Sequence, residues 1–207
     1  MEILLSKENY TSRVDQIADF LIQGIRGGLF VPGQRLIESD LTEELGISRG
    51  PLREAFRLVA EKGLIDLIPN RGAIVKKFTL ADIIQRFHLI DQLGSMCLQQ
   101  INSEQIDKSR LEIIVNSHDR ENGNILSQAI DLYYYLAKTS NNILLADIII
   151  FLNITHFSRY IINLIKLDTI TSREYFLEIY RAILNDSPDY ALKAHATWSQ
   201  DLLRHCE

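Results

Sequence analysis

The stretch from Ser48 to Val75, SRGPLREAFRLVAEKGLIDLIPNRGAIV, decides the fold of the N-terminal part of the chain. Its apolar residues recur at i, i+3, i+4, i+7 and i+8, which is the spacing of one face of an α-helix. These residues are Leu52, Ala55, Phe56, Val59 and Ala60. Arg49, Arg53 and Arg57 recur at i, i+4 and i+8 on a different face. The pattern therefore predicts an amphipathic helix with an arginine face.

The residues at both ends of this helix fit its start and its continuation. Ser48 is a good N-cap residue because its hydroxyl can accept a hydrogen bond from the first turn, where Pro51 is also tolerated. After the helix, two β-prone runs, residues 64–68 and 73–75, flank a turn signal at residues 69–72. The sequence thus predicts a β-hairpin, or wing, directly after the helix.

Two further helices are expected upstream. Residues 35–47 read as a short helix with Ser39 as its cap and Gly46 at its end, and residues 10–27 carry apolar residues at helical spacing. A short helix, a tight turn with glycine and a helix that begins at Ser-Arg have helix-turn-helix spacing.

The arginine face indicates a polyanionic partner. Like charges four residues apart repel in an isolated helix, and a polyanion reverses that cost. Arginine also makes bidentate contacts to guanine and to phosphate, and Arg71 lies in the turn of the wing. The alternative is a solvated arginine face beside an ordinary surface hairpin. Because capped turn, stripe and wing occur together and in order, we favour DNA binding.

At this point the chain resembles a known family. Residues from about 10 to 77 are similar to the winged-helix domain of the GntR family of bacterial transcription regulators. The residues that carry the resemblance are 25–29, 32–33, 35–36, Glu38, Leu41, 45–49, 51–55, 64–65 and 71–75. A position that is often basic in this family, just after Glu38, is Ser39 here, so one expected DNA contact is missing.

The resemblance implies which residues face DNA. Ser48, Arg49, Gly50 and Arg53 are expected to do so from the recognition helix and its cap, and the wing tip adds two more. Together with the third arginine of the stripe, the predicted DNA-binding residues are Ser48, Arg49, Gly50, Arg53, Arg57, Arg71 and Gly72.

Length and composition set further bounds. A chain of 207 residues suits one or two domains. It has no run near 18 apolar residues and no signal-peptide pattern in its first residues, so we expect a cytoplasmic protein without a membrane span. Cys97 and Cys206 lie far apart and without metal-ligand spacing, which is typical of reduced thiols.

Charge is unevenly distributed along the chain. The net charge is −5, but residues 1–80 are close to neutral, and the acidic excess belongs to the remainder. Local pattern, rather than net charge, governs DNA binding. A nearly neutral DNA-binding domain suggests that affinity requires two copies acting together.

The second half reads as all-helical. Thr79 is expected to cap a helix from residue 81, and further helices are expected at about 104–118, 122–139, 143–166, 171–185 and 188–205. The apolar residues of 143–165 cover a wide arc, so this helix must be buried on more than one side. We therefore expect an N-terminal winged helix-turn-helix domain (1–78) followed by an antiparallel bundle of about six helices (79–207).

This helical half resembles the FCD-type effector domain of one GntR branch, through residues 136–137, 142, 182–183, 189 and 191. The resemblance implies effector binding and dimerisation, and a divalent metal held by one aspartate and three histidines. Those ligand positions fall at Ala129, Tyr133, Phe176 and Trp198, so we predict no metal and no other cofactor. A site made of His156, His195 and Asp131 is a lesser alternative.

An aromatic pocket should replace the metal and prefer a more apolar or larger ligand, or be filled by its own side chains. Arg159 lies in an otherwise apolar helix, so we expect it to be half-buried and to bind an anionic ligand or form an internal ion pair. The predicted effector-pocket residues are Tyr133, Arg159, Phe176, His195 and Trp198.

The sequence thus predicts a homodimeric, ligand-responsive regulator, more specifically a repressor, on a pseudo-palindromic operator of double-stranded DNA. The effector would be a small metabolite. The alternative is an effector-independent regulator whose helical half only dimerises. An enzyme is disfavoured because the chain lacks a glycine-rich phosphate loop, a nucleophile elbow and HExxH.

Overall fold

The computed structural model describes residues 12–69, 71–101, 103–116, 125–152 and 154–206. The chain divides into two compact units, Met1–Lys77 and Phe78–Glu207. Among the described residues, no single helix has the length and apolar composition to cross a membrane; α7 (Ile143–Phe151) and α8 (Ile154–Ile165) pass that test only as a pair bent by 45°.

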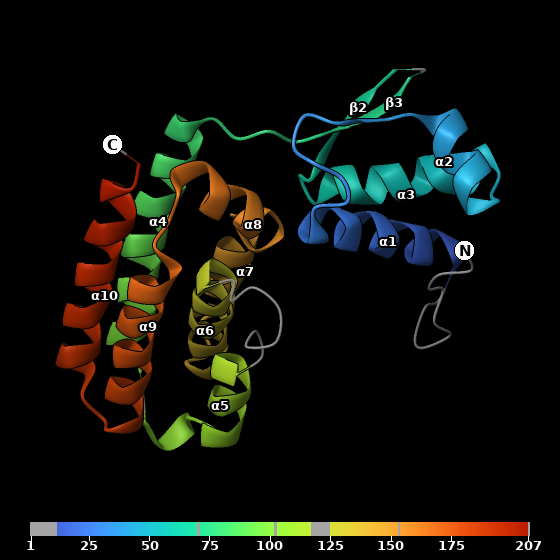
Figure 1. The fold of residues 1–207 in the computed structure, drawn as a ribbon. Coiled ribbons are helices and arrows are strands. Elements are labelled where there is room, and N and C mark those ends of the chain that lie inside the picture. The colour runs from blue at the N-terminus through green and yellow to red at the C-terminus, as the bar shows by residue number, and fades with distance from the viewer. Residues whose placement is uncertain (1–11, 70, 102, 117–124, 153, 207) are drawn as a thin grey trace. The chain divides into compact units, whose positions relative to one another are not determined.

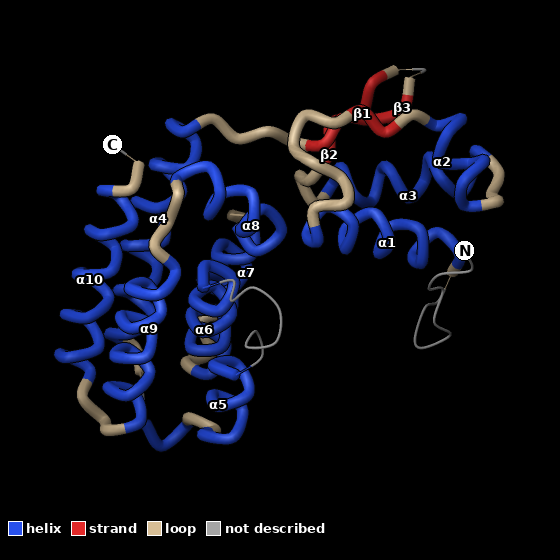
Figure 2. The backbone as a smooth tube through the Cα atoms, viewed as in Figure 1, coloured by secondary structure: helices blue, strands red, loops and turns tan. Residues whose placement is uncertain are grey.

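The N-terminal unit is a winged helix-turn-helix, as the sequence predicted (Figures 1 and 2). Its three antiparallel strands have the order β1-β3-β2, and β2 pairs with β3 in the register Ile65↔Val75 and Ile68↔Gly72. The elements are α1 (Arg13–Gly27), β1 (Arg35–Leu36), α2 (Glu38–Leu45), α3 (Arg49–Glu61), β2 (Ile65–Ile68) and β3 (Gly72–Val75).

The core of this unit lies between α3, α1 and the sheet. The apolar stripe of α3 is buried as expected, with Leu52 and Val59 at 0% exposure, and α3 packs mainly on α1 and β2. From α1, Leu21 is buried at 0% exposure. Full burial of each large apolar side chain contributes about 1.5–3 kcal/mol, so this packing fixes the rotation of α3 about its axis.

Three local predictions for this unit were wrong. Arg35 and Leu36 form strand β1, not helix, because they pair with Ile74 and Ala73 of β3, far away in sequence. As a result α2 starts at Glu38 with Ile37, rather than Ser39, at the N-cap.

Ser48 does occupy the N-cap of α3, but its side chain makes no capping hydrogen bond. The expected start of α1 at residue 10 lies outside the described residues, and so does Asn70 in the wing turn. Within the described part, Ser12 caps α1 by accepting a hydrogen bond from the Asp15 amide at 3.2 Å.

Gly72, at the start of β3, joins the wing to β1. It has φ +95°, and a Cβ atom there would lie 2.1 Å from the Leu36 carbonyl oxygen. Only glycine tolerates both the backbone conformation and the contact. Gly72 therefore allows the wing to approach the strand that precedes α2.

The C-terminal unit is a bundle of helices, again as predicted (Figure 1). α10 packs mainly on α9 and α4, and α6 packs mainly on α7, α8 and α4. In addition to α7 and α8, the elements are α4 (Leu80–Gln99), the 3-10 turn η1 (Ser103–Gln105), α5 (Lys108–Asn116), α6 (Ile125–Thr139), α9 (Thr169–Leu184) and α10 (Pro188–Arg204).

The single helix predicted for residues 143–166 is two helices, α7 and α8. Leu152 caps the end of α7, and its carbonyl oxygen accepts a hydrogen bond from Arg86 Nε at 3.3 Å. Arg86 is half-buried on α4 and stacks over the Phe78 ring at 4.1 Å. The expected ends of helices at 118 and 122 lie outside the described residues.

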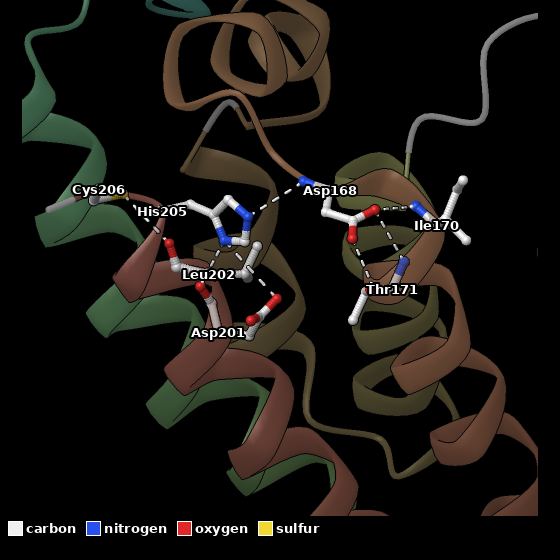
Figure 3. Close-up of polar contacts among 7 residues, drawn as sticks. All are labelled: Asp168, Ile170, Thr171, Asp201, Leu202, His205 and Cys206. Atoms are coloured by element: carbon white, nitrogen blue, oxygen red, sulfur yellow. Dashed lines mark hydrogen bonds and ion pairs between the residues drawn. The ribbon is translucent and has the colours of Figure 1, made fainter.

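Helix caps fix the start of α4 and the hairpin of α9 and α10. Thr79 caps α4 as predicted, in a reciprocal capping box with Asp82. Asp168 caps α9 by accepting from the Thr171 hydroxyl at 2.7 Å, and this hydrogen bond lowers its pKa. The Asp168 amide in turn donates to Nε2 of His205, at the C-cap of α10 (Figure 3), at 3.4 Å. This contact ties the start of α9 to the end of α10.

A glycine pair tests the account of the wing. Gly72→Ala should destabilise the N-terminal unit by at least ~2 kcal/mol, because Ala is strained at positive φ and clashes with backbone. Gly50→Ala should stabilise it by ~0.5–1 kcal/mol, because Gly50 lies in α3 with nothing within 4 Å of an added Cβ. Urea unfolding followed by far-ultraviolet circular dichroism measures both changes.

Trp198, the only tryptophan, lies in the C-terminal unit and supplies the control. Its fluorescence transition should stay at the same urea concentration in both variants. Equal stability of the two variants would contradict the role assigned to Gly72.

Candidate nucleic-acid interface

The arginine face of α3 is exposed on the N-terminal unit. The apolar stripe is turned inward, so Arg49, Arg53 and Arg57 all lie on the solvent side of the same helix. Gly50 and Ser48, at the start of α3, are exposed as well. The start of this helix, where unpaired amides and the positive end of the helix dipole lie, therefore adds to the attraction for an anion.

Arg53 is held by an acidic residue from α2. Its Nε lies 3.0 Å from both carboxylate oxygens of Glu38, and its Nη2 lies 2.9 Å from Oε2. The hydrogen bond with Glu38 raises the pKa of Arg53. Glu38 thus occupies the side edge of the guanidinium and leaves Nη1 and one Nη2 hydrogen pointing outward. A guanidinium held in this way keeps a donor pair in a fixed orientation.

The other arginines differ in their partners. Arg57 forms an ion pair with Glu54, one turn earlier on α3. Within the described part of the chain, the Arg49 and Arg71 side chains form no ion pair or hydrogen bond, and both are exposed. Arg49 and Arg71 are therefore available to an outside partner at no internal cost.

A hollow of about 320 Å³ lies between α3 and the wing. Glu38, Arg53 and Arg57 line it from the helical side, and Leu67 and Pro69 line it from the wing. The recognition helix and the hairpin thus border one concave, partly basic surface. A larger hollow of about 530 Å³ between α1 and α3 is lined by acidic residues, among them Asp15 and Glu61, which do not suit a polyanion.

The structure places the predicted DNA-binding residues as follows. Six are exposed on the surface of α3 or of the wing: Ser48, Arg49, Gly50, Arg53, Arg57 and Arg71. Gly72 is buried, so we correct its expected role: it shapes the wing through its backbone and presents no side of its own.

Sequence reasoning missed Glu38 as a functional residue. It was noted only as part of the resemblance, because nothing in the spacing of residues 38 and 53 shows that they meet. An acidic residue in the first turn of a predicted helix is ordinarily explained by the helix dipole. Only the crossing of α2 and α3 reveals the contact.

The predicted effector-pocket residues of the helical unit lie largely in its core. Tyr133 and His195 are each 1% exposed, and the Tyr133 hydroxyl lies 2.7 Å from His195 Nδ1. His195 Nε2 lies 2.9 Å from the Asp91 carbonyl oxygen. A carbonyl can only accept, so Nε2 carries the proton and Nδ1 accepts from Tyr133. The three residues form a hydrogen-bonded chain across α6, α10 and α4.

Burial keeps this chain neutral. It raises the pKa of Tyr133 well above its usual value, so the phenol stays protonated. It also lowers the pKa of His195, despite the nearby Asp91 carboxylate at 3.5 Å. Gly94 of α4 makes room, since a Cβ there would lie 2.8 Å from His195 Cε1.

The other predicted pocket residues divide. Phe176 and Trp198 are each 1% exposed, so they lie in the same core as expected. Arg159 is exposed, so its expected half-buried position was wrong: only one face of α8 is covered, and Arg159 lies on the other.

The metal site of the FCD resemblance does not fit this chain. Its four positions hold alanine and three aromatic residues, none of which is a usual ligand for a divalent metal. Among the described residues, no group of three or more His, Cys, Asp or Glu side chains could hold a metal, so the alternative of His156, His195 and Asp131 is also wrong. Both ring nitrogens of His195 are engaged by Tyr133 and Asp91.

Comparison with known proteins agrees with the geometry of the N-terminal unit. Residues 13–75 match the family described as "Bacterial regulatory proteins, gntR family". The chain is 30% identical over 90 residues to the uncharacterized HTH-type transcriptional regulator YdhC of Bacillus subtilis, and 40% identical over 68 residues to the HTH-type transcriptional repressor RspR of Escherichia coli. These matches cover 44% and 33% of this chain and only 40% and 30% of the relatives' lengths.

A solved structure extends the likeness in fold to both units. A GntR-type regulator structure from Rhodococcus sp. RHA1 superposes with a TM-score of 0.77 at 22% identity, over 94% of this chain and 98% of that one. At this identity the likeness concerns the fold alone. Residues 13–75 are thus a GntR-type winged helix-turn-helix DNA-binding domain, and they are followed by a mostly helical unit.

The buried chain through His195 predicts a pH dependence of stability. Because the pKa of His195 is lowered from 6.5 in the folded state, the unfolded chain binds more protons just below that pH. The free energy of unfolding of the helical unit should therefore be fully retained above pH 6.5 and fall as the pH drops below it, by at most ~1.4 kcal/mol per pH unit for this one group.

Urea unfolding followed by Trp198 fluorescence at pH 7.5 and pH 5.5 measures this loss. His195→Gln should abolish most of the difference, whereas the matched variant His88→Gln, at an exposed position of α4, should keep it. An unchanged pH dependence in His195→Gln would contradict the assignment.

Proposed function

We propose that this chain is a cytoplasmic, ligand-responsive transcription regulator that binds an operator as a homodimer and acts as a repressor. The single observation that carries the proposal is the exposed arginine face of α3 beside the wing, on a domain of the GntR type. The similarity to the repressor RspR supports the direction of control.

The geometry suggests how each part would bind. α3 fits the major groove, which admits one α-helix. Glu38 holds the side edge of Arg53, so the outward nitrogens of Arg53 suit the O6 and N7 of a guanine. Arg49 is positioned for a second base or for a phosphate, and Arg71 would bind the backbone from the wing. Phosphate contacts would supply affinity, and base contacts would supply specificity.

Two copies would be required for tight binding. The first 80 residues are nearly neutral, and two of the three arginines on α3 already have acidic partners. One domain therefore contributes few unpaired cations. Two domains on half-sites about 34–36 Å apart would read a pseudo-palindromic operator.

A buried donor supports a ligand for the helical unit. The indole Nε1 of Trp198 is buried and has no hydrogen-bond partner within the described part of the chain. An unpaired buried donor costs about 1–3 kcal/mol. A small metabolite with an acceptor group beside Trp198 would recover that energy. It would regulate DNA binding only if it preferred one arrangement of the two DNA-binding domains.

The alternative function is a regulator without an effector, whose helical unit only dimerises. The packing of Tyr133 and His195 supports it, since both side chains are buried and satisfy each other. Titration of metabolites against Trp198 fluorescence separates the two functions. A saturable change that also alters operator affinity supports sensing, and its absence across metabolite classes supports dimerisation alone.

Replacing Arg49 and Arg53 together by alanine tests the DNA-binding surface. An operator would first be selected from a random duplex library with the unmodified protein. The double variant should lose at least ~100-fold in affinity for it, because each good bidentate contact contributes about 1–3 kcal/mol. Fluorescence anisotropy at fixed salt measures this loss.

A matched pair controls for charge. Arg110→Ala with Arg181→Ala removes two exposed arginines from the helical unit and should leave affinity within about threefold, since these charges lie away from α3. If the folded Arg49/Arg53 variant still prefers the operator over a scrambled duplex, α3 is not the recognition helix.

Glu38→Gln tests whether this residue positions Arg53. Loss of a negative charge beside the DNA should raise affinity for scrambled duplex several-fold. Freeing Arg53 should at the same time lower the ratio of operator to scrambled affinity by about tenfold. Anisotropy titrations with both duplexes measure the ratio. A ratio equal to that of the unmodified protein would show that Arg53 reads the operator without Glu38.

A further inference from the structure

Helix α7 (Ile143–Phe151) presents an apolar stripe to solvent. Leu144, Ile148 and Phe151 recur at i, i+4 and i+7 and are 71%, 41% and 79% exposed. Ile143 and Ile150 flank the stripe and are also exposed. These five residues are called the α7 face below.

The opposite side of α7 already anchors the helix to its own unit. Leu145, Ala146 and Ile149 are at most 3% exposed. A helix that is apolar all round is normally buried all round, yet here only the inner side is covered. The sequence pattern of this segment demanded burial on more than one side, and the fold of one copy supplies only one of them.

The size of the α7 face fits a protein partner. Its exposed apolar area is roughly 500 Å², which is at the upper end for a single patch on a monomer. A stable interface of standard size buries about 800 Å² per partner. The α7 face with a polar rim around it therefore suits the apolar centre of such an interface.

Charge identifies a second copy as the occupant. From residue 81 onward the chain has 16 acidic and 11 basic residues, so two helical units repel each other at long range. Between Lys138 and Arg159 the only charged residue is Asp147, which lies beside the stripe. The α7 face is thus a nearly uncharged patch on an acidic unit, where two copies can meet with little repulsion.

The stripe is also suited to pair with itself. A two-fold axis requires the same patch on both partners. With the axis near Ile148, two antiparallel α7 helices would set Leu144 of each copy against Phe151 of the other. We propose that the α7 face is the surface through which two copies of this chain dimerise. The inference rests on the homodimer of the proposed function and names its interface.

Charged substitutions test the interface. Sedimentation equilibrium of the full chain should give twice the 23.8 kDa of one copy. Leu144→Glu with Phe151→Glu should raise the dimer dissociation constant by about 30-fold or more, because central apolar residues dominate such interfaces. Both side chains are mostly exposed in one copy, so the variant should keep its Trp198 unfolding transition.

A matched variant uses exposed apolar residues of α4. Leu89→Glu with Met96→Glu, at 51% and 43% exposure, should leave the dissociation constant unchanged. Dissociation caused by the α4 variant and not by the α7 variant would overturn the proposal, as would a monomeric unmodified protein at micromolar concentration.

A disulfide provides a positive test. Ile148→Cys should form an intermolecular disulfide under mild oxidation, because the residue lies near the expected axis, whereas Leu89→Cys should not. Cys97 and Cys206 are buried and give little background. Equal cross-linking by both variants would count against the α7 face.

Two further readouts separate this proposal from its alternatives. Loss of the dimer with retained weak binding to a single half-site would uphold both the interface and the proposed function. A dimer that dissociates in the α7 variant, with no DNA preference in any form, would leave the interface standing and reject the proposed function. If the unmodified protein co-sediments with phosphatidylglycerol vesicles and the α7 variant loses only that property, the face belongs to a membrane and the proposal fails.

Discussion

The packing of α3 on α1 is the constraint on which the N-terminal unit depends. Leu52, Ala55 and Val59 are completely buried, and a helix seated by such a stripe cannot rotate without exposing it. The positions of the arginines follow from this seating and not from any contact of their own. The same core residues that stabilise the fold therefore determine which surface is basic.

The sequence was sufficient wherever a signal was local and periodic. The α3 stripe, the hairpin at residues 64–75 and the cap at Thr79 each depend on residues within one or two turns, and each was predicted. Strand β1 was missed because Arg35 and Leu36 are held by β3, nearly forty residues later. The break between α7 and α8 was missed because the run is apolar throughout, and its end is fixed by Arg86 from another helix.

The candidate sites follow the same division. Exposure of Arg49 and Arg71 could be predicted from the stripe and the turn, whereas the Glu38–Arg53 pair required the crossing of two helices. In the helical unit, aromatic residues were expected where related proteins hold metal, but the hydrogen-bonded chain from Tyr133 through His195 to Asp91 joins three helices far apart in sequence. Arg159 was misplaced because an apolar neighbourhood in sequence does not tell which side of a helix is covered.

The anchoring of α7 has a consequence for how such proteins diverge. Its inner residues and the Arg86 bond to a backbone carbonyl hold the helix in place, and neither depends on the side chains that point outward. Those outward positions can change without disturbing the fold. Duplicated genes could therefore acquire distinct α7 faces early, so that each product would assemble only with itself while reading DNA with a nearly unaltered α3.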